Sequence, residues 1–188
     1  MAKQPPMKAW LILGASLLAV SSAGAVFEMM QGPGPLLKAS WRLQATALVL
    51  FPGFVIQWKN ADLELKQRFK KRETLLIMGL SGIFLTLHFG SWVWSLDETT
   101  LTHSLLFVTT HPLVIIVGLW LLGKSANRRE VIGAIIGFTG AAIAILDAGA
   151  DNDVSLFGDF LAFIGAVTVV GYLMAGRVLR KWMPLFLY

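Results

Sequence analysis

The stretch that decides the fold is residues 9–30, AWLILGASLLAVSSAGAVFEMM, which follows a short start carrying Lys3 and Lys8. This stretch has two possible interpretations, a cleaved secretory signal and a membrane-spanning helix. Two lysines, an apolar run over residues 10–20 and small residues over 21–25 form the pattern of a cleaved secretory signal. The whole stretch also offers about 22 positions, enough helix to cross a bilayer core of roughly 30 Å. The rest of the chain decides between a removed signal and a retained membrane helix.

The composition of the whole chain is that of a membrane protein. Hydrophobic residues make up 56% of it and charged residues only 14%, whereas a soluble domain usually carries about 25% charged residues. A secreted domain left after signal cleavage would often contain paired cysteines, and this chain has no cysteine. Disulfides and thiolate metal sites are therefore excluded, and the sequence predicts neither a metal nor a cofactor.

Six long apolar runs divide the chain, each a candidate membrane-spanning helix. They cover residues 9–30, 41–58, 74–96, 101–122, 131–148 and 157–179. The fifth is the shortest and requires Asp147 to lie at the membrane interface. Strict alternation of polar and apolar residues is missing, which argues against a transmembrane barrel. The predicted fold is an all-α integral membrane protein, a polytopic bundle of about six transmembrane helices.

The basic residues indicate the orientation of this bundle. With the N-terminus in the cytoplasm, fourteen of the 16 lysines and arginines fall in cytoplasmic segments, and only Lys38 and Arg42 fall outside. The outer side collects the acidic residues Asp97, Glu98, Asp147, Asp151, Asp153 and Asp159. The positive-inside rule therefore predicts a cytoplasmic N-terminus, and we expect no nucleic-acid partner for these basic clusters. Cleavage after Ala25 would reverse every later crossing, so residues 9–30 are predicted to stay as the first helix.

Four stretches match the order and spacing of one known family. They are SSAGAVFEMMQGPGPLLKASWRLQATALVLFP (21–52), LHFGSWVWSLDETTLTHSLLFVTTHPLVIIVGLWLLG (87–123), VIGAIIGFTGAAIAI (131–145) and GDFLAFIGAVTVVGYLMAGRVLRKW (158–182). Shared features include Arg42 at the start of the second helix, Pro112 in the fourth, and Tyr172 and Arg177 in the sixth. Together they resemble the EamA family of the drug/metabolite transporter superfamily.

The resemblance implies an architecture of ten helices in two inverted five-helix repeats. Residues 1–150 would form the first repeat, and residues 151–188 would begin the second with one helix and the start of a seventh. The chain is then either a fragment of a longer gene product or a half-transporter that needs a second half or a homo-oligomer. One departure from the family is Lys124, which follows Gly123 where an acidic residue is common.

The function implied by the resemblance is alternating-access transport of small organic metabolites such as amino acids or related solutes. The partners would be a small-molecule solute and the lipid bilayer, that of the cell membrane rather than of an organelle. Two alternatives stay open, a non-transporting membrane subunit and an intramembrane enzyme. The sequence contains no H-E-x-x-H, G-x-S-x-G or phosphate-loop motif, which disfavours the enzyme.

The third predicted helix carries a polar stripe. Five residues share one helical face: Ser81, His88, Ser91, Trp92 and Ser95. Lipid cannot satisfy their polar groups, so this face must turn toward other helices or a wet cavity. His88 and Trp92 could line a substrate path, or His88 could simply hydrogen-bond to a neighbouring helix.

The fourth predicted helix contains a proline within its apolar run. Pro112 should kink the helix and free a backbone carbonyl about one turn earlier, near Val108. Thr109 and His111 lie beside this kink and are candidates for contact with a substrate. A kink that only improves packing and a hydrogen-bonded core histidine are the alternatives.

The predicted substrate-binding residues should converge on one mid-membrane cavity. They come from the first, third, fourth and sixth helices and are Ser22, His88, Trp92, Thr109, His111 and Tyr172. The fifth helix should stay outside this cavity and pack closely on its neighbours through Gly133, Gly137 and Gly140. Glu28 should reach the outer interface, where Arg42 could pair with it.

Overall fold

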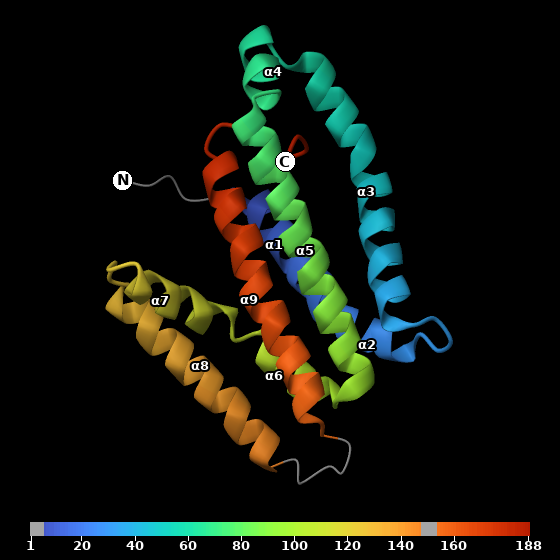
Figure 1. Cartoon of the computed structure of the whole chain (residues 1–188), viewed down its shortest axis with the longest axis vertical. Helices are drawn as coiled ribbons and strands as arrows, with labels where there is room; N and C mark the ends of the chain where they lie inside the picture. Colours follow the sequence, from blue (N-terminus) through green and yellow to red (C-terminus); the bar gives the residue numbers. More distant parts are fainter. Residues whose placement is uncertain (1–5, 148–153) are drawn as a thin grey trace.

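A computed structural model describes residues 6–147 and 154–188. In these residues every regular element is an α-helix (Figure 1). The helices are α1 (Met7–Ser21), α2 (Ala23–Met29), α3 (Pro35–Asn60), α4 (Leu63–Phe69), α5 (Arg72–Glu98), α6 (Leu101–Val108), α7 (His111–Leu121), α8 (Arg128–Asp147) and α9 (Leu156–Leu179). The predicted all-α fold is confirmed.

Five helical stretches among the described residues are long and apolar enough to cross a membrane. They are Met7–Met29 (α1 with α2), Pro35–Asn60 (α3), Arg72–Glu98 (α5), Leu101–Leu121 (α6 with α7) and Leu156–Leu179 (α9). The remaining apolar run, at 131–148, corresponds to α8 of 20 residues, which is not among the five. Many large apolar side chains of these helices are exposed, as expected for a surface that faces lipid.

The helices α5 and α9 run side by side through the centre of the bundle (Figure 1). Glycines on α9 allow this approach, because a Cβ placed on Gly171 would lie 2.7 Å from the Phe84 ring. A Cβ on Gly165 would lie 3.4 Å from Trp92 Cβ, whereas carbon atoms usually pack about 3.5–4.0 Å apart. The outer helices build on this pair, with α3 on α5, α6 on α9, and α8 on α6 and α7.

Hydrogen bonds between side chains fasten α5, α6 and α9 together at one end of the bundle. Asp159 accepts a hydrogen bond from Thr99 Oγ1 at 3.1 Å, and its second carboxylate oxygen lies 3.2 Å from His103 Nδ1. The hydroxyls of Ser95 and Ser104 are 2.6 Å apart and fully buried. Because buried polar groups are costly without partners, these bonds fix the turn between α5 and α6 against the start of α9.

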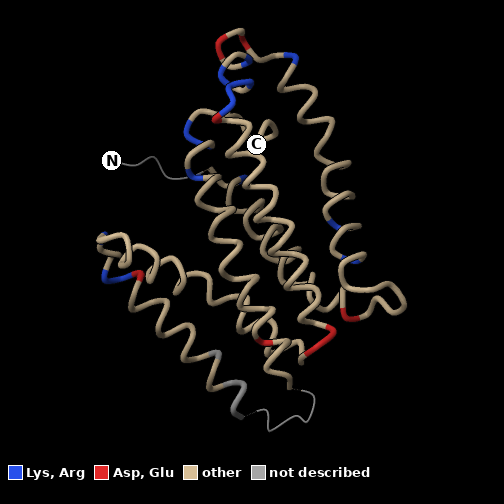
Figure 2. Tube along the Cα trace, viewed as in Figure 1, with Lys and Arg blue, Asp and Glu red and all other residues tan. Residues whose placement is uncertain are grey.

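Basic residues are unevenly distributed between the two ends of the bundle (Figure 2). Lysines and arginines gather where α3 passes through α4 into α5, and where α9 ends. Acidic residues lie at both ends: Asp62, Glu64 and Glu73 accompany the basic residues around α4, whereas Asp97, Glu98 and Asp159 lie near the turn between α5 and α6, where Asp97 pairs with Lys38 at 3.1 Å. The bias therefore rests on the basic residues, and by the positive-inside rule it predicts that the α4 end faces the cytoplasm.

The basic connection between α3 and α5 contains the short helix α4, which we expected only as a charged segment between spans. Asp62 caps this helix, since its Oδ1 accepts a hydrogen bond from Leu65 N at 2.7 Å. At the other end, the ring of Phe69 packs edge-on against Trp58 with the ring centres 5.0 Å apart. The cap and the aromatic contact together explain why this polar segment is helical.

The residues after α9 form turns that fold back onto the bundle, where we expected the beginning of a seventh helix. Met183 and Leu187 are buried against α3, α4 and α5 side chains. Phe186 N donates a hydrogen bond to Gln57 Oε1 at 2.8 Å, and the hydroxyls of Tyr188 and Ser81 are 2.7 Å apart. This segment therefore ties α3 and α5 together at the α4 end of the bundle.

The orientation can be tested with two matched cysteine variants of this cysteine-free chain. Gln67→Cys lies in α4 and Gln31→Cys in the connection between α2 and α3, and both glutamines are exposed. We expect a membrane-impermeant maleimide to label Gln31→Cys in intact cells and to label Gln67→Cys only after permeabilisation. The opposite pattern would reverse the assigned orientation. The predicted outer loop at 149–155 lies largely outside the described residues, so Gln31 represents that side.

Candidate substrate site

His88 lies between the two central helices and contacts the backbone of α9. Its Nδ1 is 2.8 Å from the carbonyl oxygen of Gly165. The imidazole stacks on Trp92, with ring centres 6.2 Å apart and 15° between the planes, and meets Phe89 at 4.8 Å. The bond to Gly165 matches the interhelical alternative for His88, and the contact with Trp92 also joins it to a group of aromatic rings.

Arg42 reaches into the same group of rings from α3. Its guanidinium carbon is 4.5 Å from the ring centre of Phe89, 5.5 Å from that of Phe27 and 5.7 Å from that of Trp92. A cation at these distances is attracted by the ring electrons. We call Phe27, Arg42, Phe89 and Trp92 the arginine–aromatic cluster; it brings α2, α3 and α5 together.

Two hydrogen-bond donors in this cluster have no partner among the described residues. They are Arg42 Nη1 and Trp92 Nε1, and both atoms are shielded from solvent. The Trp92 side chain is buried throughout, since only 6% of the residue is exposed. Native structures rarely leave buried donors unpaired, so these two atoms are donors that a further acceptor would satisfy.

The carboxylates of this end of the chain do not supply that acceptor within the described residues. Asp97 pairs with Lys38, and Glu98 accepts a hydrogen bond from an indole of its own helix. Glu28, for which Arg42 was a possible partner, is exposed and forms no ion pair with it there. Sequence reasoning missed Arg42 as a site residue; the available signal was an arginine in an apolar helix that carries no acidic residue.

The fourth predicted span is broken into α6 and α7 at Thr109–Thr110. The structure places Pro112 in the first turn of α7, where a missing N–H removes no helical hydrogen bond. Hydroxyl groups satisfy carbonyls at the break, because Thr109 Oγ1 donates to the Leu105 oxygen at 2.7 Å and Thr110 Oγ1 to the Phe107 oxygen at 2.6 Å. The interruption therefore exposes few unsatisfied backbone groups to the membrane interior.

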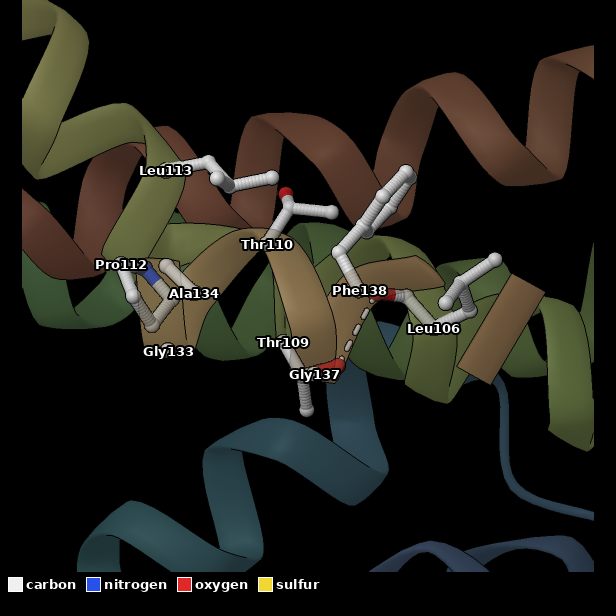
Figure 3. A pocket seen from close by; sticks show the side chains of 9 residues that line it. All are labelled: Leu106, Thr109, Thr110, Pro112, Leu113, Gly133, Ala134, Gly137 and Phe138. Atoms are coloured by element: carbon white, nitrogen blue, oxygen red, sulfur yellow. Dashed lines mark hydrogen bonds between the residues drawn. The ribbon is translucent and has the colours of Figure 1, made fainter. Parts of the chain in front are cut away.

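A pocket of about 260 Å³ adjoins this break, between α6, α7 and α8 (Figure 3). It is lined by Leu106, Thr109, Thr110, Pro112, Leu113, Gly133, Ala134, Gly137 and Phe138. A Cβ placed on Gly133, Gly137 or Gly140 would have no neighbour within 4 Å. These glycines thus make no close helix contact within the described chain, and two of them widen the pocket. The fifth span, which we predicted to stay outside the substrate cavity, contributes Gly133, Ala134, Gly137 and Phe138 of α8 to this pocket.

The other predicted residues lie apart from one another. Ser22 is exposed, and its hydroxyl bonds to its own helix. Tyr172 stacks on Tyr188 with ring centres 5.9 Å apart. His111 Nδ1 lies 3.4 Å from the Val108 oxygen, the carbonyl expected to be freed by the proline. The described residues therefore show no single cavity lined by all six candidates, and a substrate role for each stays a prediction.

The groups that the structure brings together are donors and ring faces. Within residues 6–147 and 154–188, no three His, Asp or Glu side chains lie together as metal ligands. Ring faces and a few placed donors recognise a solute by stacking and hydrogen bonding. Groups of this kind can hold a small solute.

The helical spans and buried polar groups define the class of the chain as a polytopic helical membrane protein. The sequence profile of the EamA-like transporter family matches residues 7–146, and the chain belongs to this family. The uncharacterized transporter YojE of Bacillus subtilis (strain 168) is 26% identical over 117 residues, which cover 62% of this chain and 38% of that protein. The matched region therefore spans less than half the length of this relative. No solved structure matches the chain.

Proposed function

We propose that the chain forms part of a carrier that moves small organic metabolites, such as amino acids or related solutes, across a cell membrane by alternating access. Membership of the EamA-like transporter family and the name of the Bacillus subtilis relative support transport as the activity. The observation that carries the proposal is the span interrupted between α6 and α7 beside a pocket. A second half, from further chain or from a partner, completes the pathway.

The interruption gives this span two helical pieces that can change their mutual angle. α6 packs along α9, and α7 also contacts α9 before it leans outward with α8 (Figure 1). Because the hydroxyls of Thr109 and Thr110 already bond to nearby carbonyls, bending here leaves few backbone groups unsatisfied in lipid. Rocking of α7 and α8 against α6 and α9 would open and close the pocket, which is the kind of motion that alternating access requires.

Filling the pocket should slow transport without preventing membrane insertion. Gly137→Leu adds a side chain within the pocket lining, whereas Gly140→Leu adds the same side chain to α8 outside that lining. Neither added Cβ has a neighbour within 4 Å, so neither change should disturb folding. In the complete carrier reconstituted into liposomes, we expect Gly137→Leu to lower the initial uptake rate roughly tenfold or more and Gly140→Leu to change it less than about twofold.

Two results would contradict this proposal in different ways. Equal uptake rates for Gly137→Leu and Gly140→Leu would remove the pocket from the transport pathway. Failure of the correctly inserted wild-type carrier to move any of a panel of amino acids and organic acids would contradict transport itself. That second result would favour the non-transporting membrane subunit.

A further inference from the structure

From the two unpaired donors of the arginine–aromatic cluster, we infer that Arg42 and Trp92 form a binding site for the carboxylate group of an organic solute. The inference rests on the proposed transport function and names the chemical class of the solute, a carboxylic acid. Arg42 Nη1 and Trp92 Nε1 supply the hydrogen bonds. The ring centres of Phe27 and Phe89 lie 5.5 Å and 4.5 Å from the guanidinium carbon and help to hold it in place.

The charge of Arg42 is the first argument for an anionic ligand. A guanidinium stays protonated in proteins and has donors but no acceptor. Inside a membrane span such a charge is costly and normally meets a partner. The described chain gives Arg42 aromatic rings in place of a carboxylate. A bound anion would supply the missing opposite charge.

The second donor, Trp92 Nε1, indicates that the ligand carries a group with more than one acceptor oxygen. The indole nitrogen of Trp92 can only donate, and Arg42 lies close to that ring, with its guanidinium carbon 5.7 Å from the ring centre. A carboxylate has two oxygens and can accept from both side chains at once. A neutral amide has one acceptor oxygen, and its NH₂ group would face a donor or a cation. The cluster should therefore select acids over their amides.

The position of Arg42 along α3 favours a solute over a lipid headgroup as the bound anion. Arg42 lies seven residues after Pro35, the first residue of α3, which is about 10 Å along the helix axis. The ion pair between Lys38 and Asp97 lies nearer that end of the helix. An arginine that snorkels would extend its head toward the interface, whereas Arg42 Nη1 is shielded beneath aromatic rings. A lipid phosphate would have to leave the headgroup layer to reach it.

The enclosure of both donors fits the proposed mechanism. Arg42 Nη1 and Trp92 Nε1 are shielded from solvent, whereas the Arg42 residue as a whole stays partly exposed. For a solute to accept from both donors, α2 or α3 would have to move away from α5. A carrier that works by alternating access passes through states in which its site is closed. The structure therefore corresponds to a closed arrangement of this binding site.

The test measures thermal stabilisation of the purified protein by matched acids and amides. The probes are two pairs, L-leucine with L-leucinamide and 4-methylpentanoate with 4-methylpentanamide. Each pair compares a carboxylate with the corresponding amide, and the second pair does so in molecules that have no amino group. We expect each acid to raise the melting temperature more than its amide. Arg42→Lys should weaken the apparent affinity for the acids by about tenfold or more and Trp92→Phe by about three- to tenfold, because each removes a hydrogen bond to a charged group.

Matched controls separate loss of binding from loss of fold. Arg177→Lys makes the same change at an exposed position of α9, and Trp94→Phe removes an exposed indole of α5. Both controls should keep the wild-type response to the acids. Equal stabilisation by acid and amide in the wild-type protein would overturn the inference, and this comparison needs no variant that could misfold.

Two further measurements are needed. One distinguishes an organic acid from a lipid phosphate as the bound anion, and the other distinguishes failure of the transport proposal from failure of the carboxylate site. The first measurement uses nanodiscs of phosphatidylcholine with and without phosphatidylglycerol to test whether the anion is a lipid. If phosphatidylglycerol stabilised the protein, Arg42→Lys abolished this effect and the acids had none, the cluster would bind a lipid phosphate. That result would overturn the inference.

The second measurement compares binding of the acids with their uptake. Acid binding without uptake would contradict transport and leave this site standing. Uptake of acids and amides with equal KM, unchanged in Arg42→Lys, would leave transport standing and overturn the site.

Discussion

Asp159→Ala should lower the free energy of unfolding by about 3 kcal/mol, because it removes a buried carboxylate that binds two side chains. Asp159 accepts from Thr99 at 3.1 Å and lies 3.2 Å from His103 Nδ1. Its side chain is only 10% exposed, so water cannot readily replace the lost bonds. Thr99 and His103 would be left at the junction of α5, α6 and α9 without this acceptor.

The measurement is reversible unfolding of the purified protein in detergent, followed by circular dichroism, with Glu28→Ala as the control. Glu28 is also an acidic residue near this end of the bundle, and it is exposed. Removing an exposed carboxylate usually changes stability by less than about 0.5 kcal/mol. A loss for Asp159→Ala no larger than that of Glu28→Ala would show that the hydrogen bonds at this junction contribute little.

Gly158→Ala should destabilise the protein by about 1–3 kcal/mol, because the added methyl group would overlap the turn that follows α5. The new Cβ would lie 2.6 Å from Thr99 Cβ and 2.8 Å from the carbonyl carbon of Glu98. A backbone atom cannot move aside as a side chain can, so α9 itself would have to shift. At Gly171 the same substitution meets only the ring of Phe84, and we expect a smaller loss there.

The matched control for this substitution is Gly82→Ala. Gly82 lies within α5, and a Cβ placed on it has no neighbour within 4 Å. Alanine in an open helix position favours the helix by about 0.5–1 kcal/mol relative to glycine, so this variant should be as stable as the wild type or more stable. The same detergent unfolding series measures both. Equal stability of Gly158→Ala and Gly82→Ala would contradict the close contact between α9 and the α5 turn.

The membrane spans could be predicted from the sequence because they depend on local properties. Length and hydropathy decide whether a segment can cross a bilayer, and basic residues in short loops decide its direction. Neither needs knowledge of which helices touch. The short helix α4 was missed for the opposite reason, since it depends on the cap at Asp62 and on contact of Phe69 with Trp58 in the preceding helix.

The sites were harder to predict because they depend on contacts between distant parts of the chain. Phe27, Arg42 and Phe89 come from three helices and meet only when these helices pack. Gly133 and Gly137 show the same limit, because spaced glycines either admit a neighbouring helix or leave space beside it. The spacing of the glycines does not show whether a neighbouring helix packs against them. In the structure the space beside them is open.

The interrupted span also bears on how the protein accommodates bilayers of different thickness. Leu101–Leu121 has 21 residues, about 31 Å if it were one straight helix, whereas α5 has 27 residues and a length of about 40 Å. Long helices meet hydrophobic mismatch by tilting as a whole, at a modest cost for each ångström. With α6 packed along α9 and α7 leaning outward with α8, the broken span can change its effective length by bending at Thr109–Thr110, while α5 and α9 keep their tilt.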